Sequence, residues 1–164
     1  MIVLVLGGAR SGKSGHAERF AASLPEPVSY VATACVDGDA DFAARVEEHR
    51  ARRPASWTTI ESGPDLPAVL RATTGTVLLD ALGAWLATAP DLAVDAGVLC
   101  DALTTRAGDT VVVSEEVGLG VHPATAAGRR FRDALGELNQ AVAAVADEVV
   151  LVVAGRALRL EAAG

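Results

Sequence analysis

Short apolar runs alternate with longer segments of helical periodicity along this chain. Continuous runs of Val, Leu and Ile are typical of strands that are buried on both faces of a parallel sheet. Strands are therefore predicted at residues 2–6, 28–32, 57–60, 76–79, 110–114 and 149–153. Helices are predicted near residues 14–22, 40–52, 66–72, 83–88, 94–105 and 125–146. This alternation predicts a single α/β domain over residues 1–164, with a mostly parallel sheet and helices on both of its faces.

Composition and charge exclude several classes of protein. No apolar run reaches the roughly 20 residues that a membrane span requires, and the N-terminus has the pattern of a strand rather than a signal peptide. Cys35 and Cys100 lack a metal-binding spacing, so a reducing cytoplasm is expected. The net charge of −7 argues against binding to nucleic acid. The arginines are clustered, which is typical of local phosphate binding.

A phosphate-binding motif follows the first predicted strand directly. The eight residues are Gly7-Gly8-Ala9-Arg10-Ser11-Gly12-Lys13-Ser14, and a helical segment follows them. Strand, glycine-rich loop and helix together form the setting in which G-x-x-x-x-G-K-[ST] binds a nucleoside triphosphate. Lys13 is expected to reach the β- and γ-phosphates, and the Ser14 hydroxyl to bind Mg²⁺.

Carboxylates stand at the ends of two later strands. Asp80 follows an apolar run and fits a Walker-B acid that orients Mg²⁺ beside Ser14. The pair Glu115-Glu116 follows the run at 110–114. This pair could contact metal or ribose, or could belong to a solvated turn, and the residues alone do not decide between these readings.

Residues 45–54 combine arginines with His49 in an unusual local composition. A neutral imidazole ringed by guanidinium groups could attack phosphorus and form a phosphoramidate. Composition alone favours a plainer reading, a surface helix with i,i+4 ion pairs. His16 and His122 are expected to be structural.

Several segments together are similar to one family. The chain resembles the bifunctional adenosylcobinamide kinase / adenosylcobinamide-phosphate guanylyltransferase family of cobalamin biosynthesis. The similarity rests on the loop at 7–14 and on the segments 30–34, 45–54, 57–61, 78–80, 116–123, 131–133, 139–140 and 146–155. The loop alone does not identify a family. The His-Arg segment at 45–54 is specific in combination with E-V-G-L-G-V-H-P at 116–123, F-R-D at 131–133 and N-Q at 139–140.

The resemblance implies two reactions in an α/β P-loop protein. In such proteins a histidine at the position of His49 accepts GMP from GTP, and the guanylyl group then passes to adenosylcobinamide phosphate. The same chain phosphorylates adenosylcobinamide with ATP or GTP. The implied nucleotide contacts are the loop at 7–14, Ala32, Thr33, Ala34, Arg50, Ala51, Arg52, Arg53, Glu61 and Asp80. A homotrimer is also implied.

This chain departs from the family pattern at two of its acidic positions. Glu115 stands where members often have Asn, and Asp80 replaces a Glu seen in some of them. Two simpler functions remain open beside the resemblance. One is a plain P-loop kinase of a small molecule, and the other is a non-catalytic nucleotide switch, although the [NT]-K-x-D guanine signature is missing.

Overall fold

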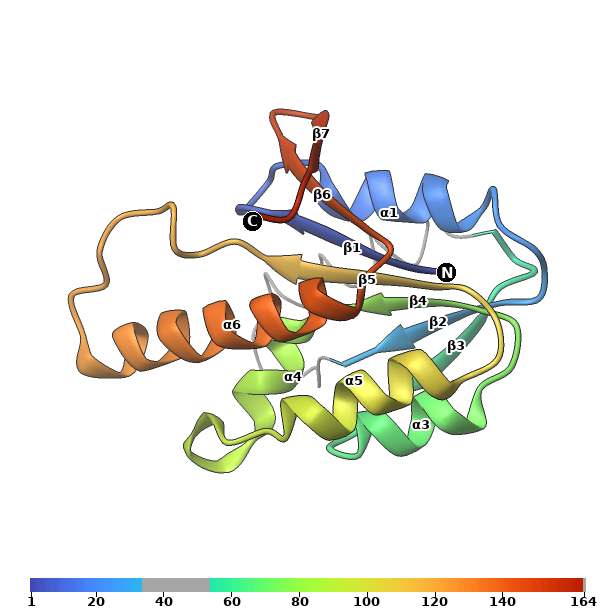
Figure 1. The fold of residues 1–164 in the computed structure, drawn as a ribbon, viewed down its shortest axis with the longest axis horizontal. Coiled ribbons are helices and arrows are strands. Elements are labelled where there is room, and N and C mark those ends of the chain that lie inside the picture. Colours follow the sequence, from blue (N-terminus) through green and yellow to red (C-terminus); the bar gives the residue numbers. More distant parts are fainter. Residues whose placement is uncertain (34–53, 164) are drawn as a thin grey trace.

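A computed structural model describes residues 1–33 and 54–163 of the chain. A seven-stranded sheet with the order β3-β2-β4-β5-β1-β6-β7 forms its centre (Figure 1). The strands are β1 (Ile2–Gly7), β2 (Val28–Ala32), β3 (Thr58–Glu61), β4 (Thr76–Asp80), β5 (Thr110–Glu115), β6 (Glu148–Val153) and β7 (Arg156–Leu160). The helices are α1 (Lys13–Ala21), α3 (Leu66–Ala72), α4 (Leu82–Thr88), the 3-10 turn η1 (Pro90–Leu92), α5 (Ala96–Thr105) and α6 (Ala126–Val145). The helix predicted at 40–52 lies outside the described residues.

All strands except β7 pair in parallel, which confirms the predicted mostly parallel α/β sheet. Each of the six predicted strands is present, with ends shifted by one residue or less. Strand β7 was not predicted. It pairs antiparallel with β6 at the edge of the sheet, and all five of its residues are exposed, so it lacks the apolar pattern of a buried strand.

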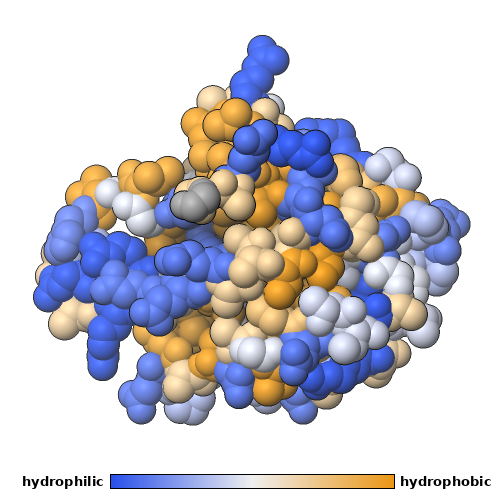
Figure 2. All heavy atoms as spheres, in the orientation of Figure 1, coloured by the Kyte–Doolittle hydropathy of each residue, from blue (hydrophilic) through white to orange (hydrophobic). Residues whose placement is uncertain are grey.

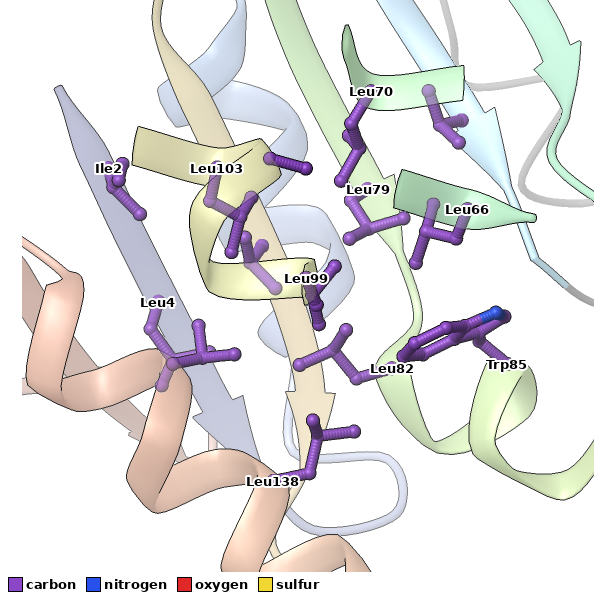
Figure 3. Close-up of a cluster of buried hydrophobic side chains, with 14 of the residues drawn as sticks. Ile2, Leu4, Leu66, Leu70, Leu79, Leu82, Trp85, Leu99, Leu103 and Leu138 are labelled. Carbon is purple, nitrogen blue, oxygen red and sulfur yellow. The ribbon is translucent and has the colours of Figure 1, made fainter. Parts of the chain in front are cut away.

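Helices cover both faces of the sheet, but unequally (Figure 1). Alternate residues of β1 point to opposite faces, and all six are buried. Ile2, Leu4 and Leu6 join a core cluster with α3, α4, α5 and α6, part of which Figure 3 shows. Val3 and Val5 join the cluster on the other face, where α1 packs. The sheet therefore carries an apolar layer on each side.

Side-chain caps fix the first residue of three helices. Asp65 accepts a hydrogen bond from the Ala68 N–H at 3.2 Å, which starts α3. Asp95 does the same for α5 through the Val98 N–H at 3.0 Å. Thr125 caps α6 through the Gly128 N–H at 3.0 Å. Such caps satisfy N–H groups that have no partner within the helix, and here they set where each helix begins.

The parallel strands β1, β4 and β5 end at one edge of the sheet, on the left in Figure 1. The loop at 7–14 and the segment 116–125 both begin at this edge. Ligand sites of parallel α/β sheets lie at the carboxyl ends of the strands, so a ligand site is expected at this edge. Within residues 1–33 and 54–163, none of the helices combines the length and the apolar character that crossing a bilayer requires.

Candidate functional site

The loop at 7–14 joins the buried strand β1 to the first turn of α1. Gly12 precedes the helix with a φ of 93°, a left-handed conformation that glycine adopts without strain. The Ser11 N–H donates to the Gly8 carbonyl at 3.3 Å, which closes the loop on itself. A Cβ at Gly7 would lie 2.7 Å from the Val152 carbonyl oxygen, so this position also requires glycine. The geometry is that of a loop whose N–H groups curl around an anion in front of a helix N-terminus.

The hairpin formed by β6 and β7, next to the loop strand β1, supports this loop. The Gly155 N–H donates to the Ser11 carbonyl at 2.8 Å. A Cβ on Gly12 would lie 3.3 Å from the Gly155 Cα, so the two backbones pass closely. Sequence reasoning missed this contact. The signal that could have shown it is the pair Ala154-Gly155, a two-residue turn with positive φ at both residues, which is typical of a β-hairpin.

Lys13 and Ser14 occupy the first turn of α1, as the motif predicts. The Lys13 Nζ lies over the loop and donates to the Gly8 carbonyl at 3.5 Å. The Lys13 N–H donates to Ser11 Oγ at 3.3 Å. Ser14 is half-buried beside it. A long cationic side chain above a ring of backbone N–H groups can neutralise the β- and γ-phosphates of a nucleotide.

Asp80 ends β4, two strands away from the loop strand β1. The Tyr30 hydroxyl donates to its Oδ2 at 2.6 Å, which orients the carboxylate. A hydroxyl from Ser14 and a carboxylate from Asp80 are the oxygen donors that Mg²⁺ prefers. Among the described residues no three His, Cys, Asp or Glu side chains gather into a metal site of their own. The donor set therefore fits a magnesium ion that is held mainly by nucleotide phosphates, with few protein ligands.

The predicted contacts on β2 and β3 lie farther from the loop. Thr33 is 2% exposed, and its hydroxyl donates to the Ala81 carbonyl at 2.6 Å, so it ties the end of β2 to the residue after Asp80. Ala32 is half-buried beside it and pairs in register with Glu61 of β3. Glu61 is exposed and lies four strands from β1, about 19 Å at the usual strand spacing. Any nucleotide contact of Glu61 would therefore involve the nucleoside end and not the phosphates.

The two carboxylates whose role the sequence left open have different surroundings. Glu116 accepts a hydrogen bond from the Gly118 N–H at 2.8 Å, as in a turn. Glu115 accepts one from the Gly83 N–H at 3.2 Å and lies in the site. Burial raises the pKa of Glu115, the Lys13 ammonium opposes that rise, and the Asp80 carboxylate adds to it. Glu115 thus lies close enough to Lys13 and Asp80 for both charges to act on it.

The remaining predicted residues are Ala34, His49, Arg50, Ala51, Arg52 and Arg53, and all lie outside the described residues. Their part in the site stays a prediction. The structure brings the loop, Lys13, Ser14 and Asp80 together at one edge and adds Glu115 to them. This arrangement can bind a magnesium nucleoside triphosphate by its phosphates.

Comparisons with known proteins agree with this site. Residues 3–160 match the family described as "Cobinamide kinase / cobinamide phosphate guanyltransferase". The chain is 43% identical to the bifunctional adenosylcobalamin biosynthesis protein CobP of Pseudomonas aeruginosa, over 96% of each chain. It is 38% identical to the bifunctional adenosylcobalamin biosynthesis protein CobU of Salmonella typhimurium, over 98% of this chain and 100% of that protein.

A solved structure shares the fold at low sequence identity. It is an ATPase from the type III secretion system of pathogenic bacteria, with a TM-score of 0.51 and 11% identity. The similarity covers 92% of this chain and 50% of the other. At this identity it supports the α/β fold alone.

Proposed function

Because the chain belongs to the cobinamide kinase / cobinamide phosphate guanyltransferase family, we propose that it carries out both reactions on adenosylcobinamide. First it phosphorylates adenosylcobinamide with ATP or GTP. Then it transfers GMP from GTP to adenosylcobinamide phosphate, which gives adenosylcobinamide-GDP and pyrophosphate. The observation that carries this proposal is that the phosphate loop and Asp80 lie at the same edge of the sheet, in a chain that matches the family over residues 3–160.

In the kinase reaction the protein mainly positions phosphates and neutralises their charge. The loop N–H groups at 7–14 and the α1 N-terminus hold the nucleotide, and Lys13 offsets charge on its β- and γ-phosphates. Ser14 and Asp80 would hold the Mg²⁺ of the bound nucleotide, which would offset further negative charge on the phosphates. Tyr30 keeps the Asp80 carboxylate in a fixed orientation.

In the guanylyl reaction we assign the nucleophile to His49. A neutral His49 nitrogen forms a bond to the α-phosphorus of GTP while the bond to pyrophosphate breaks. The guanylyl group then moves from the histidine to a phosphate oxygen of adenosylcobinamide phosphate, which restores the free imidazole. Arg50, Arg52 and Arg53 stand next to His49 in the sequence and can offset charge on the phosphoryl oxygens.

Labelled GTP tests this proposal directly. With label at the α-phosphate, the protein should acquire label that is stable to base and labile to acid, and adenosylcobinamide phosphate should remove it. His49→Ala should abolish the labelling and spare phosphorylation of adenosylcobinamide. The matched control is His122→Ala, an exposed histidine, which should label normally. Lys13→Ala should impair both reactions by at least about 100-fold, because both use the triphosphate.

Three results would contradict the proposal. Normal labelling of the His49→Ala variant would remove the nucleotidyl-transfer half. Transfer of γ-phosphate to adenosylcobinamide with no protein-bound GMP in the unaltered protein would reduce the function to a plain kinase. Tight nucleotide binding with neither transfer would indicate a nucleotide-binding switch instead.

We further propose that the enzyme acts in the cytoplasm as a homotrimer. The absence of a metal-like cysteine spacing supports a reducing compartment. The trimer is supported by the resemblance and by exposed apolar side chains on the segment 116–125 and the β6–β7 hairpin.

A further inference from the structure

Glu115 lies between the two parts of the phosphate site because of the strand order. Strand β5 separates the loop strand β1 from β4, the strand of Asp80. Glu115 pairs in register with Gly7 on one side, and Asp80 pairs with Val113 on the other. The carboxyl end of β5 is thus the position from which a side chain can reach Lys13 and Asp80 together.

Two helices, α4 and α6, hold Glu115 in place. Its Oε2 accepts the hydrogen bond from the Gly83 N–H of α4, and a Cβ at Gly83 would collide with that oxygen. Its backbone carbonyl accepts a hydrogen bond from Asn139 Nδ2 of α6 at 3.1 Å. The same Asn139 accepts the Ser114 hydroxyl at 2.6 Å. The carboxylate is therefore seated in a space that exists because residue 83 is glycine.

The neighbours of Glu115 show which phosphate it would face. Lys13 of a phosphate loop reaches the β- and γ-phosphates, and a Walker-B acid such as Asp80 would hold Mg²⁺ at the same end of the nucleotide. A group between these two lies at the γ-phosphate end of the nucleotide. A carboxylate at that place is repelled by the negative phosphate, and the Lys13 ammonium offsets part of this repulsion. Its oxygens can accept a hydrogen bond from a neutral donor. The attacking hydroxyl of an alcohol is the donor that a kinase brings to this place.

We propose that Glu115 binds the acceptor hydroxyl and takes its proton during phosphoryl transfer, an inference that rests on the kinase half of the proposed function. The hydroxyl oxygen forms a bond to the γ-phosphorus, and the bond from that phosphorus to the β–γ bridging oxygen breaks. The nucleoside diphosphate leaves with the electron pair. The proton passes to Glu115 Oε and then to solvent. Guanylyl transfer occurs at the α-phosphorus and does not use this carboxylate.

The charges around Glu115 suit such a base. The groups that act on it are the Lys13 ammonium of α1, the Asp80 carboxylate of β4 and the Gly83 N–H of α4. The net result is a pKa above the ordinary value for Glu, with burial as the largest cause. A carboxylate whose pKa is raised toward the working pH accepts a proton more readily.

The test compares both reactions in Glu115→Gln, which keeps the shape and an acceptor oxygen but loses the charge. We expect kcat for phosphorylation of adenosylcobinamide to fall by about 100-fold or more, the usual effect of losing a general base. The KM for the nucleotide, and the labelling of the protein by α-labelled GTP, should stay within about threefold. Glu116→Gln is the matched control and should keep kcat, because its carboxylate belongs to a turn.

A second variant tests whether the position of the Glu115 carboxylate against Gly83 matters. Gly83→Ala places a methyl group against Oε2 and should lower the kinase kcat in the same way. Adding it to Glu115→Gln should cost little more, since two changes that act on one group are not additive.

The outcomes separate this inference from the proposed function. If the unaltered protein phosphorylates adenosylcobinamide and Glu115→Gln does so within threefold, the inference is wrong and the function stands. Equal loss of both reactions with weaker nucleotide binding would also overturn it, because Glu115 would then hold the nucleotide. If the unaltered protein transfers no γ-phosphate to adenosylcobinamide, the kinase function fails and the inference fails with it.

Discussion

At the residue scale, the Glu115 carboxylate should cost the folded protein stability at neutral pH. Burial raises its pKa above the value in the unfolded chain, so the folded state binds more protons between the two values. Stability from this group therefore rises as the pH falls and is lost as the pH rises through the raised pKa. We expect Glu115→Gln to raise Tm by about 2–4 °C near neutral pH, because a neutral amide avoids the desolvation penalty.

Calorimetric scans over a range of pH check this expectation. The gain in Tm should shrink on acidification, as the carboxyl group of the unaltered protein becomes protonated. Glu116→Gln serves as the control and should shift Tm little at any pH. A Tm gain that does not depend on pH would mean that repacking, and not the charge, causes it. A group that lowers stability where it should assist chemistry is typical of an active site.

At the element scale, the pattern of apolar residues along the chain predicted the elements that pack into the core. The parallel strands, and the helices that lie within the described residues, were predicted because short apolar runs separated by segments of helical periodicity are typical of a parallel α/β sheet. Strand β7, Arg-Ala-Leu-Arg-Leu, was missed because charged residues interrupt its apolar positions, so it has no continuous apolar run. The other edge strand, β3, is also mostly exposed, but it was predicted from residues 57–60. Thr33 could be placed at the end of β2, but its bond to Ala81 depends on β2 and β4 being neighbours. Tertiary pairing of this kind leaves no local signal.

Another element-scale contact that the sequence does not reveal is made by Arg106, just after α5. Its guanidinium donates to the carbonyls of Thr73, Gly75, Gly108 and Asp109 and to the Thr110 hydroxyl, at 2.6–3.1 Å. These bonds join the turns before β4 and β5 at the edge of the sheet opposite the site. Arg106 is 8% exposed, so most of these carbonyls have few alternative donors.

We expect Arg106→Lys to lower the free energy of unfolding by about 2–4 kcal/mol, because an ammonium cannot reproduce the planar set of donors. Urea unfolding followed by circular dichroism measures the change. Arg71→Lys is the control, since exposed Arg71 makes one bond to the Val98 carbonyl at 3.2 Å, and should change stability by less than about 0.5 kcal/mol. Equal effects of the two substitutions would show that the Arg106 network contributes little.

At the scale of the whole molecule, the order of the strands decides the site. The sequence placed the loop, Asp80 and Glu115 at strand ends, but it could not show that β5 lies between β1 and β4. That order places Glu115 next to the loop and leaves Glu61 four strands away. The motif at 7–14 is local, so it was found completely. Gly83 acts through a distant neighbour, Glu115, and could not be found from its own sequence context.

The surface of the molecule carries exposed apolar side chains that a homotrimer would cover. Figure 2 shows apolar atoms over the β6–β7 hairpin at the top and over the segment 116–125 at the left. Val121 is 95% exposed and Leu158 is 60% exposed, which is unusual for such side chains unless a partner covers them. Burying apolar side chains between subunits would stabilise an oligomer by about 1.5–3 kcal/mol for each one fully covered.

Light scattering after gel filtration should therefore give a mass of about 50 kDa, three times the 16.7 kDa of one chain. The double variant Val121→Asp with Leu158→Asp should shift the mass toward that of one chain, because two charges would have to be buried at the contact. Val98→Asp alters another exposed apolar residue, on α5 and away from both patches, and should leave the mass unchanged. An unaltered protein that elutes as a monomer at micromolar concentration would refute the trimer. A trimer that survives the double substitution would place the subunit contact on a different surface.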